Sequence, residues 1–167
     1  MRLLIVNTLP KEAPAAQAAV QELRENVTEL RVINAYEMEL QPCVGCNACW
    51  LKTPGICSIK DGYDELLRAY LEYDAAVFIC GTALNFVDHR MKNVIDRILP
   101  LLTMLLAVED GQMRHVARYK KRLRWGMVYA GEADEDYMNR WMKRVTDNAR
   151  GECLGAFPAS RAQEVPV

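Results

Sequence analysis

Four cysteines lie close together in one segment of this chain. Cys43, Cys46 and Cys49 are followed by Cys57, so the spacing is C-x2-C-x2-C-x7-C. Three cysteines at successive two-residue gaps can reach the corners of one iron–sulfur cube, and a fourth nearby cysteine completes the ligand set. Structural zinc sites usually divide their ligands into two separated pairs, so the compact triplet favours iron–sulfur. Two other interpretations stay open: free thiols in a loop that Trp50 packs down, and a structural zinc loop.

The residues around the cysteines permit the turns that such a site requires. Gly45 can adopt a tight turn beside the cluster, and Pro54-Gly55 permits the bend that returns Cys57. Cys80 and Cys153 stand apart in predicted strands, where a free cysteine behaves as a small core residue.

The composition is typical of a single globular domain. With 167 residues, 51% of them hydrophobic, the chain can bury a core, and residues 1–167 are treated as one domain. The formal net charge of −1 exerts no long-range attraction on nucleic acid or on an anionic membrane. The basic run 114–124 lacks an aromatic stacking platform, so we expect a solvated loop there. Neither nucleic acid nor a membrane is an expected partner.

The apolar segments are too short for a membrane span or a signal peptide. A span needs about 20 apolar residues, and the opening run 3–6 is followed at once by polar residues. We therefore expect a cytoplasmic protein. In that reducing compartment, the six cysteines are expected as metal ligands or redox thiols rather than as disulfides.

Short apolar runs alternate with helical patterns along the chain. Strands are predicted at 3–6, 30–33, 75–80, 123–130 and 153–157, and helices at 16–27, 61–71, 91–98 and 134–150. This alternation predicts a doubly wound, parallel five-stranded sheet with helices on both faces, which is a three-layer α/β sandwich. The cysteine-rich loop, about 41–60, is inserted after the second strand. The stretch 101–108 has no assigned form, and the tail after Pro158 is expected to be frayed.

Ligands of such a sheet bind at the carboxyl ends of its strands. Those ends lead here into loops that begin at Thr8, Thr82 and Ala130. In the second loop, Asn85 carries an amide that can form hydrogen bonds with a ligand, and Phe86 carries a ring that can stack on one.

No catalytic side chain is assigned. His89 is expected to be a surface residue at a helix start, and His115 a structural one. Lys92, Asp96 and Arg97 are spaced like a salt-bridged helix face. No Walker-type phosphate motif and no G-x-G-x-x-G fingerprint is present.

The segment 42–101, which runs from the cysteines through the third predicted helix, resembles the NAD(P)H-dependent FMN reductase and iron–sulfur flavoprotein group of the flavodoxin superfamily. The resemblance rests on Gly45, Cys46, Cys49, Trp50, Gly55, Cys57, Asp61, Lys92, Asp96, Arg97, Gly111, His115, Arg118 and Tyr119. It implies a flavodoxin-like fold with FMN at the strand ends and a [4Fe–4S] cluster on Cys43, Cys46, Cys49 and Cys57. It also implies a homodimer or homotetramer.

The resemblance places the FMN phosphate on the loop after the first strand and the isoalloxazine ring on the loop from Thr82 to Phe86. The implied FMN-binding residues are Thr8, Pro10, Lys11, Thr82, Ala83, Leu84, Asn85, Phe86, Ala130 and Gly131. The phosphate loop departs from the family pattern. Thr8 is its one hydroxyl donor, Glu12 opposes Lys11, and Pro14 removes a backbone N–H. Hydroxyls introduced at positions 9 and 16 are therefore expected to tighten FMN binding.

We therefore expect an FMN-dependent oxidoreductase or electron-transfer flavoprotein, similar to NAD(P)H-dependent FMN reductases. Its electron donor is NAD(P)H or a protein, and its cysteine loop carries a [4Fe–4S] cluster. Its partners are small-molecule or protein electron donors and acceptors. The alternative is a flavin-free iron–sulfur or thiol redox sensor or binding module on a degenerate flavodoxin fold, which the altered phosphate loop favours.

Overall fold

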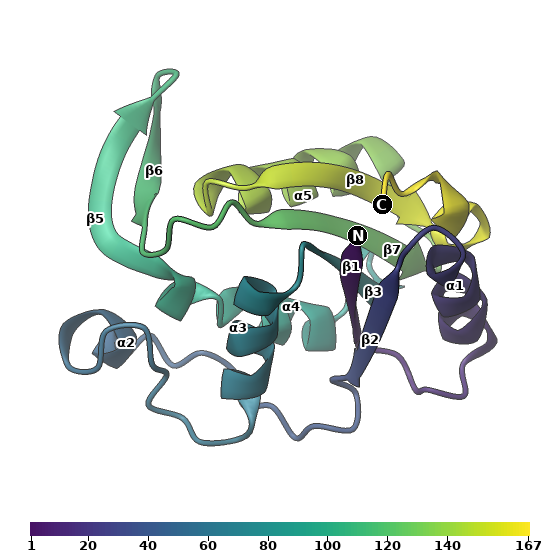
Figure 1. Cartoon of the computed structure of the whole chain (residues 1–167), viewed down its shortest axis with the longest axis horizontal. Helices are drawn as coiled ribbons and strands as arrows, with labels where there is room; N and C mark the ends of the chain where they lie inside the picture. The colour runs from purple at the N-terminus through teal and green to yellow at the C-terminus, as the bar shows by residue number, and fades with distance from the viewer.

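A computed structural model describes all 167 residues, and a parallel five-stranded sheet forms its centre. The strands are β1 (Arg2–Asn7), β2 (Glu29–Asn34), β3 (Ala75–Ala83), β7 (Arg124–Ala130) and β8 (Glu152–Pro158). Their order is β2-β1-β3-β7-β8, with every neighbouring pair parallel. Figure 1 labels these strands. This is the flavodoxin-type strand order, so the predicted sheet is confirmed. The two-residue strand β4 (Phe86–Val87) pairs antiparallel with the end of β3.

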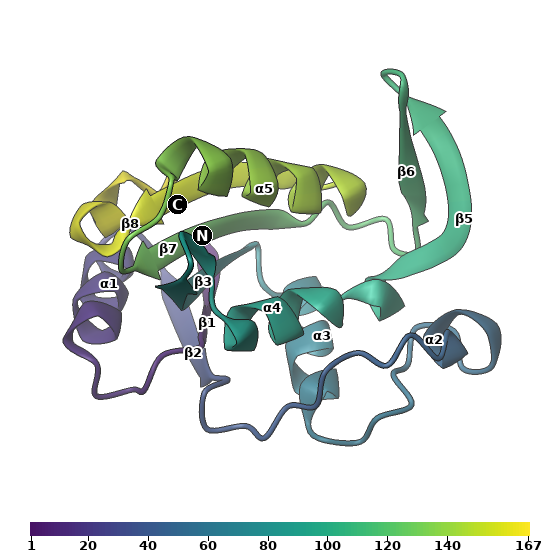
Figure 2. The ribbon, with the colours of Figure 1, turned by 180° about the vertical axis from the view of Figure 1, so that it is seen from behind.

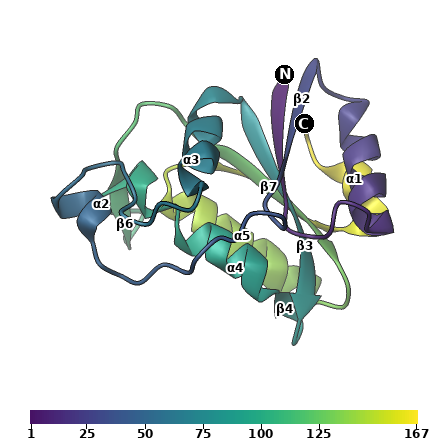
Figure 3. The ribbon, with the colours of Figure 1, turned by 90° about the horizontal axis from the view of Figure 1, so that it is seen from below.

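The central strands are apolar on both faces because helices cover both. In β1, Leu4 and Val6 face one core while Leu3 and Ile5 face the other, and all four are fully buried. On the first face lie α3 (Tyr63–Glu72), α4 (His89–Asp96) and α5 (Glu135–Asn148). On the second face lie α1 (Pro14–Arg24) and the 3₁₀ helix η2 (Ala159–Glu164). The three layers are visible in Figure 3, with α1 on one side of the strands and α3, α4 and α5 on the other.

The C-terminal tail packs rather than frays. Ala162 and Val165 are 0% and 3% exposed, and both join the core that α1 covers. The expectation of a frayed end was wrong, because these two apolar side chains fill the face that α1 alone leaves open.

A two-stranded arm projects from the domain (Figures 1 and 2). It consists of β5 (Leu102–Glu109) and β6 (Gln112–Ala117), which follow the short 3₁₀ helix η1 (Leu99–Leu101) and pair only with each other. The expectation of a loop from residue 114 onward was therefore wrong for 114–117. The arm leaves aliphatic side chains exposed, among them Leu105, Val108 and Met113.

None of the helices combines the length and the apolar character that crossing a membrane requires.

Candidate functional site

The four cysteines of the predicted metal site surround one hollow. Cys43 and Cys46 are exposed, Cys57 is half-buried, and Cys49 is buried on the single-turn helix α2 (Ala48–Leu51). All four line a largely apolar hollow of about 20 Å³, which is the room of about one water molecule. No three ligand side chains converge as metal coordination requires. The structure therefore brings the predicted ligands to one place without arranging them around an ion.

Trp50 and Arg118 attach this loop to the domain. The indole Nε1 of Trp50 donates to the Leu99 carbonyl at 2.9 Å, and its ring lies 5.3 Å from the ring of His115. Arg118 donates to the carbonyls of Pro100 and Leu102, both at 3.0 Å, and to that of Cys49 at 3.5 Å. Trp50 does pack the loop down, and His115 has the structural role that we expected.

Arg97 is buried behind the cysteines and is only 2% exposed. Its Nη1 pairs with the carboxylate of Asp61 and donates to the Gln41 carbonyl at 3.1 Å. Its Nη2 donates to the sulfur of Cys57 at 3.3 Å, and its guanidinium carbon lies 4.4 Å from the centre of the Tyr63 ring.

The prediction of a salt-bridged helix face was therefore wrong for Arg97. Only Lys92 and Asp96 form the expected exposed pair. Arg97 follows the last helical residue, Asp96, and its side chain turns inward to Asp61 rather than toward solvent.

The surroundings give the thiols and carboxylate different acidities. A hydrogen bond with Ser58, 3.3 Å from the sulfur, lowers the pKa of Cys46. Burial, followed by the neighbouring thiols, raises the pKa of Cys49. Burial opposes ionisation of Asp61, but hydrogen bonds from Arg97 and the Gln41 amide outweigh it and lower its pKa.

The two remaining cysteines differ from each other. Cys80 is fully buried, which raises its pKa and confirms it as a core residue. Cys153 is only half-buried, and its sulfur accepts a hydrogen bond from the Gly155 amide at 3.4 Å.

The loop after β1 is the predicted phosphate site. The Thr8 hydroxyl is buried and donates to the Ile79 carbonyl at 3.1 Å, so it is not free for a phosphate. Lys11 lies 3.4 Å from the Glu37 carboxylate and 3.9 Å from that of Glu12. The hydroxyl predicted to help at position 16 would not reach this loop, because Ala16 is 1% exposed and faces the core.

Backbone donors nevertheless remain in this loop. The amides of Lys11, Glu12, Ala15 and Ala16 donate to no backbone acceptor, as is usual ahead of and within a first helical turn. Such amides are the groups with which a helix N-terminus binds an anion.

The loops after β3 and β7 border a second, open hollow of about 610 Å³. Leu84 and Asn85 have φ of 52° and 60° and form the tight turn between β3 and β4. The hollow is lined by Asn85, Tyr129, Gly131, Glu132, Ala133, Asp134, Glu135 and Pro158. Its volume is in the usual range for a small-molecule site. Of the predicted FMN-binding residues, only Asn85 and Gly131 line it. The ring of Phe86 instead packs against that of Trp141 on α5, with the ring centres 5.0 Å apart.

Known proteins share the sequence pattern and the fold. The chain is 34% identical over 83 residues to an iron–sulfur flavoprotein of Methanocaldococcus jannaschii, covering 50% of this chain and 42% of that protein. It is 30% identical over 129 residues to an iron–sulfur flavoprotein of Archaeoglobus fulgidus, covering 70% and 58%. The chain is a relative of the iron–sulfur flavoproteins. It spans only about half the length of these relatives. No family model matches it.

Solved structures support the fold of this iron–sulfur flavoprotein relative. An NAD(P)H:quinone oxidoreductase from Methanothermobacter marburgensis superposes with a TM-score of 0.65 at 12% identity, covering 98% of this chain and 95% of that one. A flavone reductase gives 0.62 at 14% identity, covering 99% and 60%. The flavodoxin-like fold is thereby confirmed.

The two candidate sites of this iron–sulfur flavoprotein relative lie at opposite ends of α4. Asp88, the N-cap of α4, donates its amide to the Gly81 carbonyl at 3.0 Å, beside the loop after β3. Arg97 follows the last residue of the same helix and lines the cysteine hollow. Eight helical residues span about 12 Å at 1.5 Å each.

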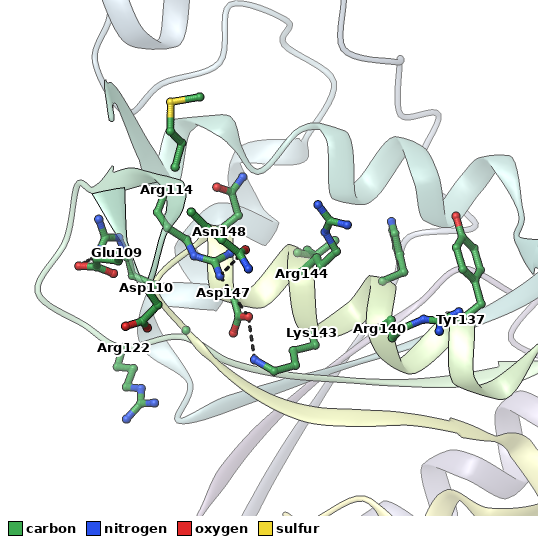
Figure 4. A pocket seen from close by; sticks show the side chains of 16 residues that line it. Glu109, Asp110, Arg114, Arg122, Tyr137, Arg140, Lys143, Arg144, Asp147 and Asn148 are labelled. Carbon is green, nitrogen blue, oxygen red and sulfur yellow. Dashed lines mark hydrogen bonds and ion pairs between the residues drawn. The ribbon is translucent and has the colours of Figure 1, made fainter. Parts of the chain in front are cut away.

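A wider groove of about 1480 Å³ lies between the arm and α5 (Figure 4). Two of its carboxylates are already paired. Asp147 lies 2.7 Å from Lys143 and 3.6 Å from Arg114, and Glu109 pairs with Arg150. None of the residues predicted for the cofactor sites lines this groove.

Proposed function

We propose that the chain is an FMN-dependent oxidoreductase or electron-transfer flavoprotein whose cysteine loop holds a [4Fe–4S] cluster. The observation that carries the proposal is the meeting of all four loop cysteines around one hollow. The names of the sequence relatives support it.

Cys43, Cys46, Cys49 and Cys57 would hold the cluster, which supplies one-electron transfer when bound. The donor chemistry fits, because no His, Asp or Glu lines the hollow beside these four thiols. The ligands must converge and lose their protons for this to happen. The tight turns of the loop are already formed, because Gly45 and Gly55 have φ of 64° and 84°. Glycine adopts this left-handed conformation without the steric cost that a Cβ would bring.

FMN would supply the hydride and electron chemistry when bound, and the chain would bind and orient it. The free amides at the start of α1 would bind its phosphate. The hollow beside Asn85 and Gly131 would hold its ring. The activity would then resemble that of NAD(P)H-dependent FMN reductases, with NAD(P)H or a protein as electron donor.

One observation favours the alternative, a flavin-free iron–sulfur or thiol redox sensor. The side chains that could bind a phosphate are already occupied, since the Thr8 hydroxyl bonds to Ile79 and Lys11 lies beside Glu37. Only backbone amides then remain for FMN, whereas the cysteine hollow needs no flavin.

The proposal extends to a homodimer or homotetramer in the cytoplasm. Exposed aliphatic side chains on an arm outside the main sheet support self-association. All six cysteines are free thiols, which suits a reducing compartment.

The test is an ultraviolet–visible spectrum of protein purified without oxygen, with assays of iron, sulfide, zinc and FMN. Flavin bands with about four irons per chain, as one cubane requires, are expected. Iron without flavin would replace the proposal with the alternative. Zinc without iron would contradict both.

A further inference from the structure

Burial of the charged Arg97 side chain carries a large desolvation penalty. Taking a guanidinium out of water costs several kcal/mol, and apolar replacements of buried ion pairs are often neutral or stabilising. Stability alone therefore does not explain why this side chain is only 2% exposed.

The hydrogen bonds of Arg97 are divided between an anchor and the cysteine hollow. On the anchor side, Nη1 is held by Asp61 and the Gln41 carbonyl. On the hollow side, Nη2 donates to the Cys57 sulfur at 3.3 Å. Nε is buried without any partner. A guanidinium has five N–H donors and no acceptor, so the unused donor of Arg97 is available only to an anion or a lone pair.

Arg97 is also the only charged residue that lines the cysteine hollow. A purely structural tie between Asp61 and Arg97 would explain the anchor, because Asp61 also accepts from the Gln41 and Tyr63 amides. It would not explain why the other side of the guanidinium faces sulfur.

We propose that Arg97 is a positioning residue that sets the reduction potential of the cysteine-bound cluster by donating a hydrogen bond to the Cys57 sulfur. This inference rests on the proposed cluster. Reduction adds one electron, and hence one negative charge, to the cluster and its thiolates. A fixed positive charge and a hydrogen bond to a ligand sulfur both favour that reduced state, and both are recognised ways in which a protein raises the potential.

The experiment compares anaerobically reconstituted wild type with Arg97→Met and Arg97→Lys. The readouts are iron content, the potential from a dithionite titration followed by electron paramagnetic resonance, and the Fe–S(Cys) bands in the resonance Raman spectrum. We expect Arg97→Met to shift the potential to a more negative value and to move an Fe–S(Cys) band. Arg97→Lys, which keeps the charge but not the guanidinium fork, should shift it less.

Two further variants make the test specific. Lys92→Met removes a cation from the exposed side of the same helix, where its partner is Asp96, and should leave the potential unchanged. Asp61→Asn retains Arg97 but removes its anchor, so it should shift the potential even where Arg97→Met does not fold.

The outcomes separate the two proposals. A wild type that takes up no iron contradicts the proposed cluster, and with it this role of Arg97. A loaded wild type whose potential and Fe–S(Cys) bands are the same in the folded Arg97 and Asp61 variants contradicts the role of Arg97 alone.

Discussion

The guanidinium of Arg97 donates a hydrogen bond to the sulfur of Cys57 at 3.3 Å, although the two residues are 40 positions apart in the chain. This contact joins the last cysteine of an otherwise exposed loop to the end of α4. Asp61 stabilises the contact from behind.

Replacing Cys46 with Ser should remove the iron from the protein without unfolding it. Cys46 is exposed, so the change leaves the core intact, whereas a four-cysteine cluster loses one ligand. Iron analysis and circular dichroism check the two parts. Cys153→Ser, outside the loop, is the matched control and should retain the wild-type iron content. A Cys46→Ser protein with unchanged iron would show that this ligand is wrongly assigned.

In the metal-free protein, Cys46 should react with iodoacetamide faster than Cys49. The Ser58 hydrogen bond lowers the pKa of Cys46, whereas burial raises that of Cys49, and the thiolate is the reacting form. Ser58→Ala should slow Cys46 by about two- to tenfold near neutral pH, because one pKa unit changes the thiolate fraction about tenfold. Mass spectrometry of quenched samples gives the rates. Cys43, also exposed, is the internal reference, and an equal slowing of both would contradict the role of Ser58.

Gly131→Ala should weaken FMN binding by about tenfold or more, which equals about 1.4 kcal/mol. Gly131 has φ of 119°, and a Cβ there would collide with the Thr82 hydroxyl, so the two loops around the proposed ring site must move apart. Gly111→Ala is the control, because Gly111 also has positive φ but lies in open space at the tip of the arm. Quenching of FMN fluorescence measures both. Equal affinities in the two variants would place the flavin elsewhere.

The stabilising effect of Asp61 should disappear in acid. Its pKa is lowered in the folded protein, so its contribution is present above the unfolded value, about 3.9, and is lost as the pH falls through the folded value. The melting temperature of Asp61→Asn should therefore lie below that of wild type at pH 7, and the difference should narrow below about pH 4. Thermal unfolding at several pH values tests this. A difference that stays constant down to pH 2 would mean that the carboxylate charge is not what stabilises the contact.

The five parallel strands were predictable because their signal is local. The runs 3–6 and 75–80 are continuously apolar, as strands covered on both faces must be. The arm gave no comparable signal. Its β5 is apolar although several of its side chains are exposed, so the run 101–108 could not be distinguished from a buried element.

Only those parts of the candidate site that residue type and spacing identify could be predicted from the sequence. The cysteines are recognisable from their gaps, and the structure gathers them. The burial of Arg97 depends on Asp61, 36 residues earlier, and the sequence beside Arg97 instead shows the surface pair of Lys92 and Asp96. The position of Ala16 was misjudged for a similar reason, because which side of α1 faces the core depends on how that helix packs on the sheet.

The arm and the cysteine loop are in contact through His115 and Trp50, so the motion of one is coupled to the motion of the other. A two-stranded sheet is marginally stable by itself, so the arm should open at a lower free-energy cost than the central sheet. Opening of the arm would break the contact of His115, which lies in β6, with Trp50. Arg118, which directly follows β6, also donates to the Cys49 carbonyl. The rate at which iron or oxidants reach the cysteines would then be set by local opening of the arm rather than by global unfolding of the domain. In hydrogen exchange, the amides of the arm and of residues 48–51 should consequently lose protection together.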